Sequence, residues 1–223
     1  MTALRGVIFD LDGTLIDSLP DVVSALNGVL DTAGRRAVTI AEGLGIVGGG
    51  AEPLLQKAFE LTGAPLDGDE LPRRVRDFLQ AYAANPVEKT VLFEGALDML
   101  DGLAAEGMPI GICTNKPHEM ALRVLDALDI RHRFASCIGK GMLGFNKPDR
   151  RHYDAVAREM GVATPETVYI GDSRTDVETA RAAGVPVVLV TFGYSAEPIE
   201  SLGADAIADR LSDLRGTIER LMA

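Results

Sequence analysis

The chain has 223 residues, 47% of them hydrophobic, and a formal net charge of −11. This length and composition fit one folded core, or a core with a modest insertion, rather than a disordered chain. The acidic balance argues against a nucleic-acid-binding protein, and no apolar run reaches the roughly 20 residues of a membrane span. With two cysteines and no room for a signal peptide before the first strand, we expect a cytoplasmic location.

The first predicted element is a short apolar strand at residues 7–9, which leads directly into two carboxylates. The stretch that follows it is Asp10-Leu11-Asp12-Gly13-Thr14. An acidic turn closed by Asp-Gly is common at strand ends, so a structural role is one reading. In the functional reading one carboxylate attacks a phosphoryl group, the other transfers the proton, and both lie near a divalent cation.

The next segment, residues 18–86, contains no predicted strand and breaks the pattern of the remaining chain. It carries amphipathic helical patterns, with apolar positions at Val22, Leu26, Val29 and Leu30 and again over residues 51–61 and 71–82. We therefore expect an α/β core of residues 1–17 and 87–223 and a helical cap of residues 18–86. The chain enters this segment at residues 15–19 and leaves it at residues 85–93, and two connections so close together suit a hinge.

A triple glycine, Gly48-Gly49-Gly50, precedes the second helical pattern of this segment. It is not a P-loop, because no strand comes before it and no lysine follows it. Its backbone N–H groups could face an anionic substrate at the helix start. A flexible turn between two helices is an equally good interpretation.

After the insertion, apolar runs alternate with helical patterns. Short runs without polar alternation are typical of parallel strands covered on both faces. The alternation of strand and helix predicts a Rossmann-like, three-layer α/β core with right-handed crossovers. The predicted strands after the insertion are Pro109–Cys113, Phe134–Ile138, Thr167–Ile170 and Val185–Val190.

Polar side chains follow four of the predicted strands. Ligands of open α/β sheets bind beyond the carboxyl ends of the strands, so these side chains should converge at one edge. Each has a structural alternative when taken alone: a turn or cap threonine, a solvated surface lysine, a helix-capping aspartate. Their convergence predicts a site. Asp10 and Asp12 follow the first strand, Thr114 and Asn115 the second, Lys147 the third, and Asp172, Ser173 and Asp176 the fourth.

The histidines and cysteines are not expected to join this site. His118, His132 and His152 show no metal-ligand spacing, and we expect them at the surface. Cys113 and Cys137 are expected to be small buried hydrophobic residues.

The order of the motifs resembles the haloacid dehalogenase superfamily, in its phosphatase branch. Asp-x-Asp-x-Thr, Thr-Asn, Lys-Pro and Gly-Asp-x-x-x-Asp occur in that order, and the helical insertion takes the place of the family's cap. Asp12 argues against dehalogenation, because haloacid dehalogenases lack this second carboxylate. Within the branch the chain is most similar to phosphoglycolate phosphatases, although Arg150 and Phe145-Asn146 depart from that pattern. The supporting stretches are Val47–Glu52, Cys113–Pro117, Gly171–Asp176 and Val190–Tyr194.

The resemblance implies a Mg²⁺-dependent phosphomonoester hydrolase with an aspartyl-phosphate intermediate on Asp10. Asp12 would protonate the leaving oxygen and later deprotonate the attacking water. The implied Mg²⁺ ligands are the side chains of Asp10 and Asp172 and the backbone carbonyl of Asp12. The remaining implied roles are phosphoryl binding by Thr114 and Asn115, charge neutralisation by Lys147, and support from Thr14, Ser173 and Asp176, with Asp176 orienting Lys147 or metal-bound water.

The expected partner is a small anionic phosphomonoester, with 2-phosphoglycolate the leading candidate. One alternative is a mutase like β-phosphoglucomutase, which returns the phosphoryl group to the bound sugar. Another is a non-catalytic binding protein, which would be expected to have lost a catalytic group. The sequence does not show whether Arg35, Arg36, Lys57 or the triple glycine selects the substrate, or whether the chain is a monomer or a homodimer.

Overall fold

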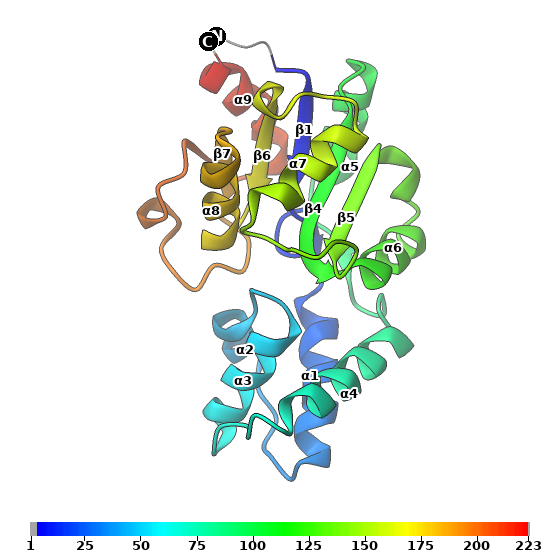
Figure 1. The fold of residues 1–223 in the computed structure, drawn as a ribbon, viewed down its shortest axis with the longest axis vertical. Helices are drawn as coiled ribbons and strands as arrows, with labels where there is room; N and C mark the ends of the chain where they lie inside the picture. Colours follow the sequence, from blue (N-terminus) through cyan, green and yellow to red (C-terminus); the bar gives the residue numbers. More distant parts are fainter. Residues whose placement is uncertain (1–3, 223) are drawn as a thin grey trace. The chain divides into compact units, whose positions relative to one another are not determined.

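The structure is a computed structural model that describes residues 4–222, and these divide into two compact units (Figure 1). The larger unit ends its first part at Asp17 and resumes at Leu92. The smaller unit is Ser18–Val91. The two-residue strands β2 (Ile16–Asp17) and β3 (Val91–Leu92) form a separate two-stranded ladder.

The larger unit is built on a parallel six-stranded sheet of order β5-β4-β1-β6-β7-β8. β1 lies at its centre, where Phe9 is in register with Ile112 of β4 and Ile170 of β6. These apolar strands are buried because helices cover both faces of the sheet. The strands are β1 (Gly6–Phe9), β4 (Ile110–Pro117), β5 (Ser136–Lys140), β6 (Thr167–Gly171), β7 (Val187–Val190) and β8 (Ala206–Ala208).

Helices on both faces complete the three layers. α7 (Arg150–Glu159) and α8 (Arg174–Ala183) pack against each other on one face (Figure 1). α5 (Ala96–Ala105) and α6 (His118–Ala127) connect strands that advance in the opposite direction across the sheet, so right-handed crossovers place them on the other face. The predicted Rossmann-like core is confirmed. α9 (Leu214–Met222) follows β8, and single-turn 3₁₀ helices occur at Arg131–Arg133, Thr164–Glu166, Ile199–Ser201 and Leu211–Asp213.

Strand limits differ from the predicted ones at several ends. β4 continues to Pro117, four residues beyond its predicted end, so Thr114, Asn115 and Lys116 belong to the strand. β8 was not predicted, because its three residues lie at the sheet edge, where Ile207 is 38% exposed and no apolar run marks the strand. Gly161 and Gly184 have positive φ values and follow the ends of α7 and α8, so these glycines terminate the helices that precede β6 and β7.

The smaller unit contains four helices. α1 (Leu19–Thr32), α3 (Ala51–Thr62) and α4 (Leu71–Ala84) match the predicted amphipathic patterns. α2 (Ile40–Ile46) was not predicted, because its seven residues are too few for a clear period. Its start is set by a capping box in which Thr39 and Glu42 satisfy each other's backbone N–H groups. No helix within residues 4–222 has the length and apolar character to cross a membrane.

The second boundary of the smaller unit depends on Asp21. This buried carboxylate accepts hydrogen bonds from the backbone N–H of Lys89 at 2.9 Å and of Thr90 at 2.8 Å, and from the Thr90 hydroxyl at 2.7 Å. The returning segment is therefore fastened to the first turn of α1. The smaller unit therefore extends to Val91, five residues beyond the predicted end of the cap at residue 86.

The expectation of surface histidines is wrong for His152. Its side chain is fully buried on the inward face of α7, and its Nε2 lies 3.1 Å from the carbonyl oxygen of Ile138. Burial lowers the pKa of His152 and favours the neutral ring. Of the two free cysteines, Cys113 is buried as expected and Cys137 is half-buried. Burial raises the pKa of both thiols to about 12, which makes them inert.

Candidate functional site

β1 delivers the first carboxylate to the carboxyl-terminal edge of the sheet. The backbone N–H of Asp10 donates to the carbonyl of Ile170 at 2.9 Å, which continues the β1–β6 pairing and places Asp10 at the strand end. The chain then turns at Leu11, whose carbonyl accepts the N–H of Thr14. Thr14 is fully buried, and its hydroxyl has no hydrogen-bond partner among the described residues. Thr14 therefore supports this turn through its backbone N–H.

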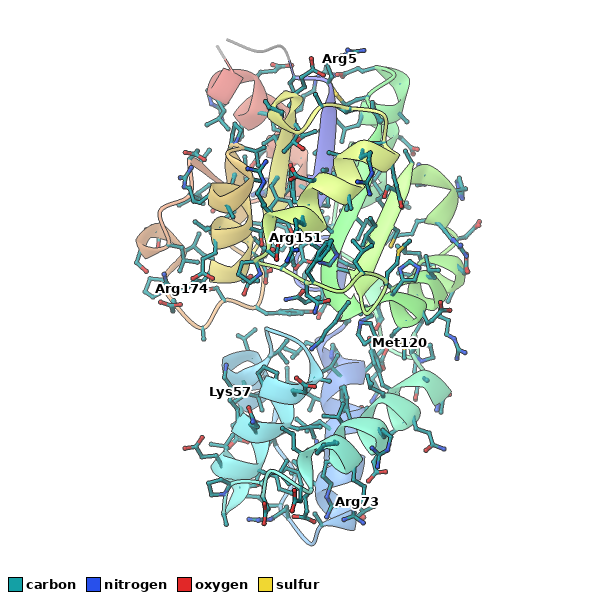
Figure 2. All side chains as sticks on the ribbon, viewed as in Figure 1. Arg5, Lys57, Arg73, Met120, Arg151 and Arg174 are labelled. Atoms are coloured by element: carbon teal, nitrogen blue, oxygen red, sulfur yellow. The ribbon has the colours of Figure 1, made fainter. Side chains whose placement is uncertain are left out.

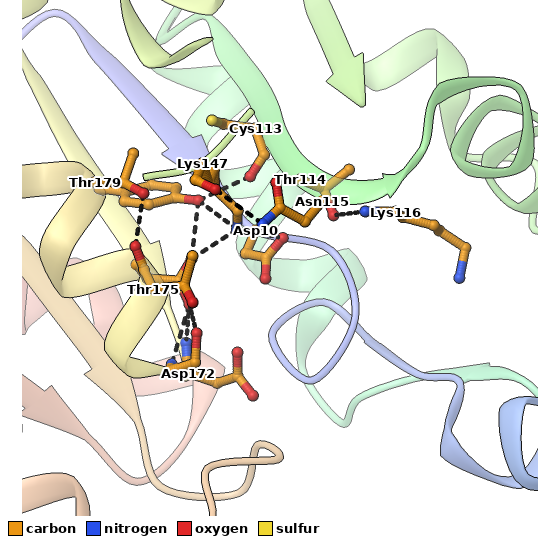
Figure 3. A network of polar contacts seen from close by, with 12 residues as sticks. Asp10, Cys113, Thr114, Asn115, Lys116, Lys147, Asp172, Thr175 and Thr179 are labelled. Atoms are coloured by element: carbon orange, nitrogen blue, oxygen red, sulfur yellow. Dashed lines mark hydrogen bonds and ion pairs between the residues drawn. The ribbon is translucent and has the colours of Figure 1, made fainter. Parts of the chain in front are cut away.

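Lys147 reaches the same point from the loop before α7 (Figure 3). Its Nζ lies 3.0 Å from Asp10 Oδ1 and donates hydrogen bonds to Asp176 Oδ1 at 2.7 Å and to the Tyr169 hydroxyl at 2.9 Å. Burial alone would lower the pKa of Lys147, but the carboxylates of Asp10 and Asp176 raise it above its ordinary value. Lys147 is therefore a buried ammonium held between two carboxylates, and the alternative of a solvated surface lysine is excluded.

β6 and α8 supply two further carboxylates. Ser173 is the N-cap of α8 and donates its hydroxyl proton to Asp176 Oδ2 at 2.7 Å, so Ser173 rather than Asp172 caps the helix. Burial would raise the pKa of Asp176, but Lys147 lowers it overall. Asp172 accepts the backbone N–H of Tyr194 at 2.6 Å, and its pKa is raised well above the ordinary value by burial and by Asp176.

Three of these carboxylates form a group that can hold a cation. One oxygen each from Asp10, Asp172 and Asp176 lies within 4.8 Å of the others, and all three residues are buried. Asp10 Oδ1 accepts no hydrogen bond within the described part of the chain, although it lies 3.0 Å from Lys147 Nζ as an ion pair. Burial raises the pKa of Asp10 to about 6. A buried, oxygen-only set with an unsatisfied acceptor fits a hard divalent cation such as Mg²⁺.

The side chain of Asp12 does not belong to this carboxylate group. Asp12 Oδ1 pairs instead with Lys116 Nζ at 2.7 Å, and a role for the Asp12 backbone carbonyl as a metal ligand stays a prediction. Asp176 is in the group and also contacts Lys147, and its role in orienting Lys147 stays a prediction.

Thr114 and Asn115 come from the irregular end of β4. The pairing of β4 with β5 shifts register between Cys113 and Pro117, so this segment leaves the regular ladder. Thr114 is buried and its hydroxyl accepts the N–H of Lys116 at 3.1 Å. Asn115 donates its side-chain amide to the carbonyl of Lys147 at 3.2 Å, which ties the second and third motifs together.

Sequence reasoning missed three residues of this network. Lys116 was considered only as part of the stretch Cys113–Pro117. Its position after a buried apolar run and the candidate residues Thr114 and Asn115 could have indicated a site residue. Tyr169 was read as core, but its hydroxyl also donates to the Cys113 carbonyl at 2.8 Å beside its contact with Lys147. Tyr194 joins Asp172 through its N–H and Asp17 through its hydroxyl at 2.8 Å. The contacts of both tyrosines are long-range and leave no local pattern.

Asp172 is enclosed by two glycines. A Cβ on Gly193 would clash with the side chain of Asp172 and lie 2.6 Å from the carbonyl oxygen of Gly13. Gly13 itself has φ +82°, and a Cβ there would also meet Asp172. The backbone on both sides of this carboxylate therefore has to be glycine if the carboxylate is to keep its place.

Gly193→Ala is accordingly expected to displace Asp172 and to weaken divalent-cation binding by about 10- to 100-fold, the usual cost of losing support for a metal ligand. Calorimetric titration with Mg²⁺ measures the effect. Gly144→Ala is the matched control, because a Cβ there meets nothing within 4 Å. Equal cation affinity in the Gly193→Ala variant and the wild type would contradict this account of the glycines.

The triple glycine lies in the smaller unit. Gly48, Gly49 and Gly50 have φ values of +122°, +75° and +96°, and Gly50 is the N-cap of α3, so this backbone needs glycine for its conformation. Arg36 pairs with Glu42, Arg35 lies over the ring of Phe59, and Lys57 is exposed on α3 (Figure 2). A substrate-binding role for these residues and the triple glycine stays a prediction.

Comparison with known proteins places this site in a family. The model of the haloacid dehalogenase-like hydrolases matches residues 7–190. Among relatives, the chain is 38% identical over 208 residues to a phosphoglycolate phosphatase of Caulobacter vibrioides, covering 93% of this chain and 88% of that one. It is 39% identical over 214 residues to a phosphoglycolate phosphatase of Rhodospirillum rubrum, covering 94% and 89%.

Solved structures agree with this assignment. The crystal structure of a "predicted phosphoglycolate phosphatase" from Haemophilus somnus superposes with a TM-score of 0.89 at 29% identity, over 97% of this chain and 98% of that one. The motif order, the parallel sheet and the family match agree along the length of the core. The chain belongs to the haloacid dehalogenase-like hydrolases, and it is an enzyme of their phosphatase type.

Proposed function

We propose that the protein is a Mg²⁺-dependent phosphomonoesterase that hydrolyses 2-phosphoglycolate through an aspartyl-phosphate on Asp10. The observation that carries the chemistry is the placement of Asp10, a buried carboxylate at the end of the central strand with Lys147 Nζ at 3.0 Å. The substrate is supported by the names of the relatives from Caulobacter vibrioides and Rhodospirillum rubrum. A cytoplasmic monomer or homodimer without a nucleic-acid partner stays the prediction from the sequence.

The reaction takes two displacements at phosphorus. In the first, a carboxylate oxygen of Asp10 bonds to phosphorus, the ester P–O bond breaks, and Asp12 gives a proton to the leaving alkoxide. In the second, Asp12 takes a proton from water as the water oxygen bonds to phosphorus and the Asp10–phosphorus bond breaks. The products are the alcohol and inorganic phosphate, and Asp12 returns to its starting protonation state.

Neutralisation of charge makes the first displacement feasible, because an anionic carboxylate has to approach an anionic phosphoryl group. Mg²⁺ held by Asp10 and Asp172 would screen this repulsion and polarise the phosphoryl oxygens. Lys147 adds a fixed positive charge beside Asp10, and Asp176 and Tyr169 hold it there. Thr114 and Asn115 stand at the end of the neighbouring strand, where they would hydrogen-bond the transferring oxygens.

Protons should compete with Mg²⁺ for this site. The pKa of Asp10 is raised to about 6, chiefly by burial, and that of Asp172 is raised as well. A raised carboxylate pKa means that the protonated form dominates below that pH, and a protonated carboxylate has to lose its proton before it binds a metal. We expect Mg²⁺ affinity to fall as the pH is lowered from about 8 to 5, by about tenfold or more per unit below about 6.

Isothermal titration with Mg²⁺ over this pH range, in two buffers of different ionisation enthalpy, measures both the affinity and the released protons. An affinity that does not change between pH 8 and 5, with no proton release, would contradict the raised pKa of Asp10 and the assignment of the carboxylates as ligands.

A phosphate-release screen tests the proposed function itself. Inorganic phosphate is measured from 2-phosphoglycolate, ethyl phosphate and sugar phosphates, with Mg²⁺ and with a chelator. We expect release with Mg²⁺, none with the chelator, and the highest kcat/KM for 2-phosphoglycolate. Comparable rates for bulky sugar phosphates would overturn the substrate, and isomerised sugar phosphate without free phosphate would show a mutase instead.

A further inference from the structure

The proposed mechanism leaves one buried charge at the site without a use. The side chain of Lys116 is 3% exposed, and its Nζ lies 2.7 Å from Oδ1 of Asp12. Burying an ammonium costs free energy, and the ion pair with Asp12 is one of the contacts that offset this cost. Lys147, the other buried lysine at this edge, has its function assigned beside Asp10. Lys116 stands beside the acid–base residue instead.

The local strand geometry directs Lys116 to this place. It belongs to the end of β4, immediately after Asn115 and where the pairing with β5 becomes irregular (Figure 3). Its backbone N–H donates to the Thr114 hydroxyl at 3.1 Å, which connects its position to the predicted phosphoryl-binding residue. Gly139 of β5 leaves room for this bend, because a Cβ there would lie 2.6 Å from the carbonyl oxygen of Lys116.

The contact with Asp12 sets where Lys116 lies relative to a bound substrate. The leaving oxygen has to approach the carboxylate of Asp12 to receive its proton. Two groups that each make a hydrogen bond of roughly 2.7 Å to one carboxylate lie about 4 to 7 Å apart. The ammonium therefore lies within reach of a substituent on the carbon that bears the leaving oxygen.

The carboxylates at this edge favour a further cation beside an anionic leaving group. Asp10, Asp172 and Asp176 already place three carboxylates here, in a chain of net charge −11. The Asp12 side chain is 25% exposed, so the pair with Lys116 lies toward the accessible side of the network. A leaving group that carries a carboxylate would be repelled unless a positive charge faced it.

We propose that Lys116 binds the carboxylate of the leaving group and thereby selects phosphomonoesters that carry a carboxylate on the ester carbon. This inference rests on the proposed function, because it assumes that Asp12 protonates the leaving oxygen. Lys116 would therefore discriminate between substrates that differ only in the charge of the group on the ester carbon.

The test compares 2-phosphoglycolate with ethyl phosphate, which has a methyl group in place of the carboxylate. In the wild type kcat/KM should favour 2-phosphoglycolate by about 100-fold or more, and Lys116→Met should reduce that ratio by about 100-fold, the usual cost of truncating one side of a buried charge contact. Lys116→Gln, which keeps a donor for Asp12 without the charge, should reduce it similarly. Arg123→Met removes one exposed charge from α6 and should leave the ratio unchanged.

Each outcome is decisive. If both Lys116 variants slow the two substrates equally, Lys116 only supports Asp12 and the inference is overturned while the hydrolase stands. If the wild type releases phosphate from both esters without a preference, the inference and the choice of 2-phosphoglycolate both fall, but the phosphatase remains. If a variant fails to fold, circular dichroism and loss of ethyl phosphate turnover reveal it, and the other variant then carries the test.

Discussion

Replacing Asp10 by Asn is expected to lower kcat for phosphomonoester hydrolysis by about 10⁴-fold or more, the scale on which removing a nucleophile acts in covalent catalysis. Asparagine has the same shape, but its neutral amide oxygen is a poor nucleophile. Asp10 is buried, and its backbone N–H donates to the carbonyl of Ile170. This hydrogen bond does not involve the side chain and survives the substitution. Release of inorganic phosphate from 2-phosphoglycolate measures the effect.

The fold should persist in this variant, so the loss is chemical. Lys147 keeps its hydrogen bond to Asp176, and the substitution removes a carboxylate whose charged form burial disfavours. The melting temperature without Mg²⁺ should therefore stay at or above that of the wild type. Asp98→Asn, which removes an exposed carboxylate from α5, is the matched control and should keep full activity. Retention of more than about one hundredth of wild-type activity by clean Asp10→Asn protein would exclude Asp10 as nucleophile.

Replacing Lys147 by Met is expected to reduce both activity and stability. Activity should fall by about 10³-fold, because the transferring phosphoryl group loses a fixed positive charge. The free energy of unfolding should fall by about 3 kcal/mol or more, because Asp10 and Asp176 are left facing each other in the interior without their ammonium. Urea unfolding in the presence of a chelator measures the second effect.

The loss of stability should depend on pH in a defined direction. Lys147 now lowers the pKa of Asp176 and opposes the burial that raises that of Asp10. Without Lys147 the pKa values of both carboxylates are higher. The variant is therefore most destabilised above neutral pH, and it recovers stability as the pH falls and these groups bind protons. Arg123→Met, at an exposed position of α6, is the control and should change neither quantity. Equal destabilisation at pH 8 and pH 5 would contradict this electrostatic explanation.

The convergence of the site could be predicted because it follows from topology. Parallel strands bring their carboxyl ends to one edge, so Asp10, Thr114 and Asp172 had to lie near one another once the strands were recognised. Lys147 was harder, since its loop could have pointed outward, and its burial depends on Asp176 of α8 and Tyr169 of β6. The motif order supplied what the strand pattern could not.

The residues that sequence reasoning missed depend on long-range contacts. Tyr169 has the period of a core strand residue, and nothing local shows that its hydroxyl meets the Cys113 carbonyl from another strand. Lys116 lies where β4 leaves its regular pairing, so alternation of side chains does not predict its direction. His152 is buried because α7 packs on the sheet and Ile138 offers its carbonyl.

The central claim is that Asp10 carries the phosphoryl group during turnover, and acid quenching with a radiolabelled phosphoryl donor tests it most directly. Acetyl phosphate is a suitable donor because its leaving group needs no proton. Asp12→Asn should then form the intermediate but hydrolyse it slowly, since it lacks the base for the second displacement. The account predicts covalent label in this variant on the peptide that contains Asp10, and none in Asp10→Asn. Label on another residue, or no covalent label while phosphate is released, would contradict it.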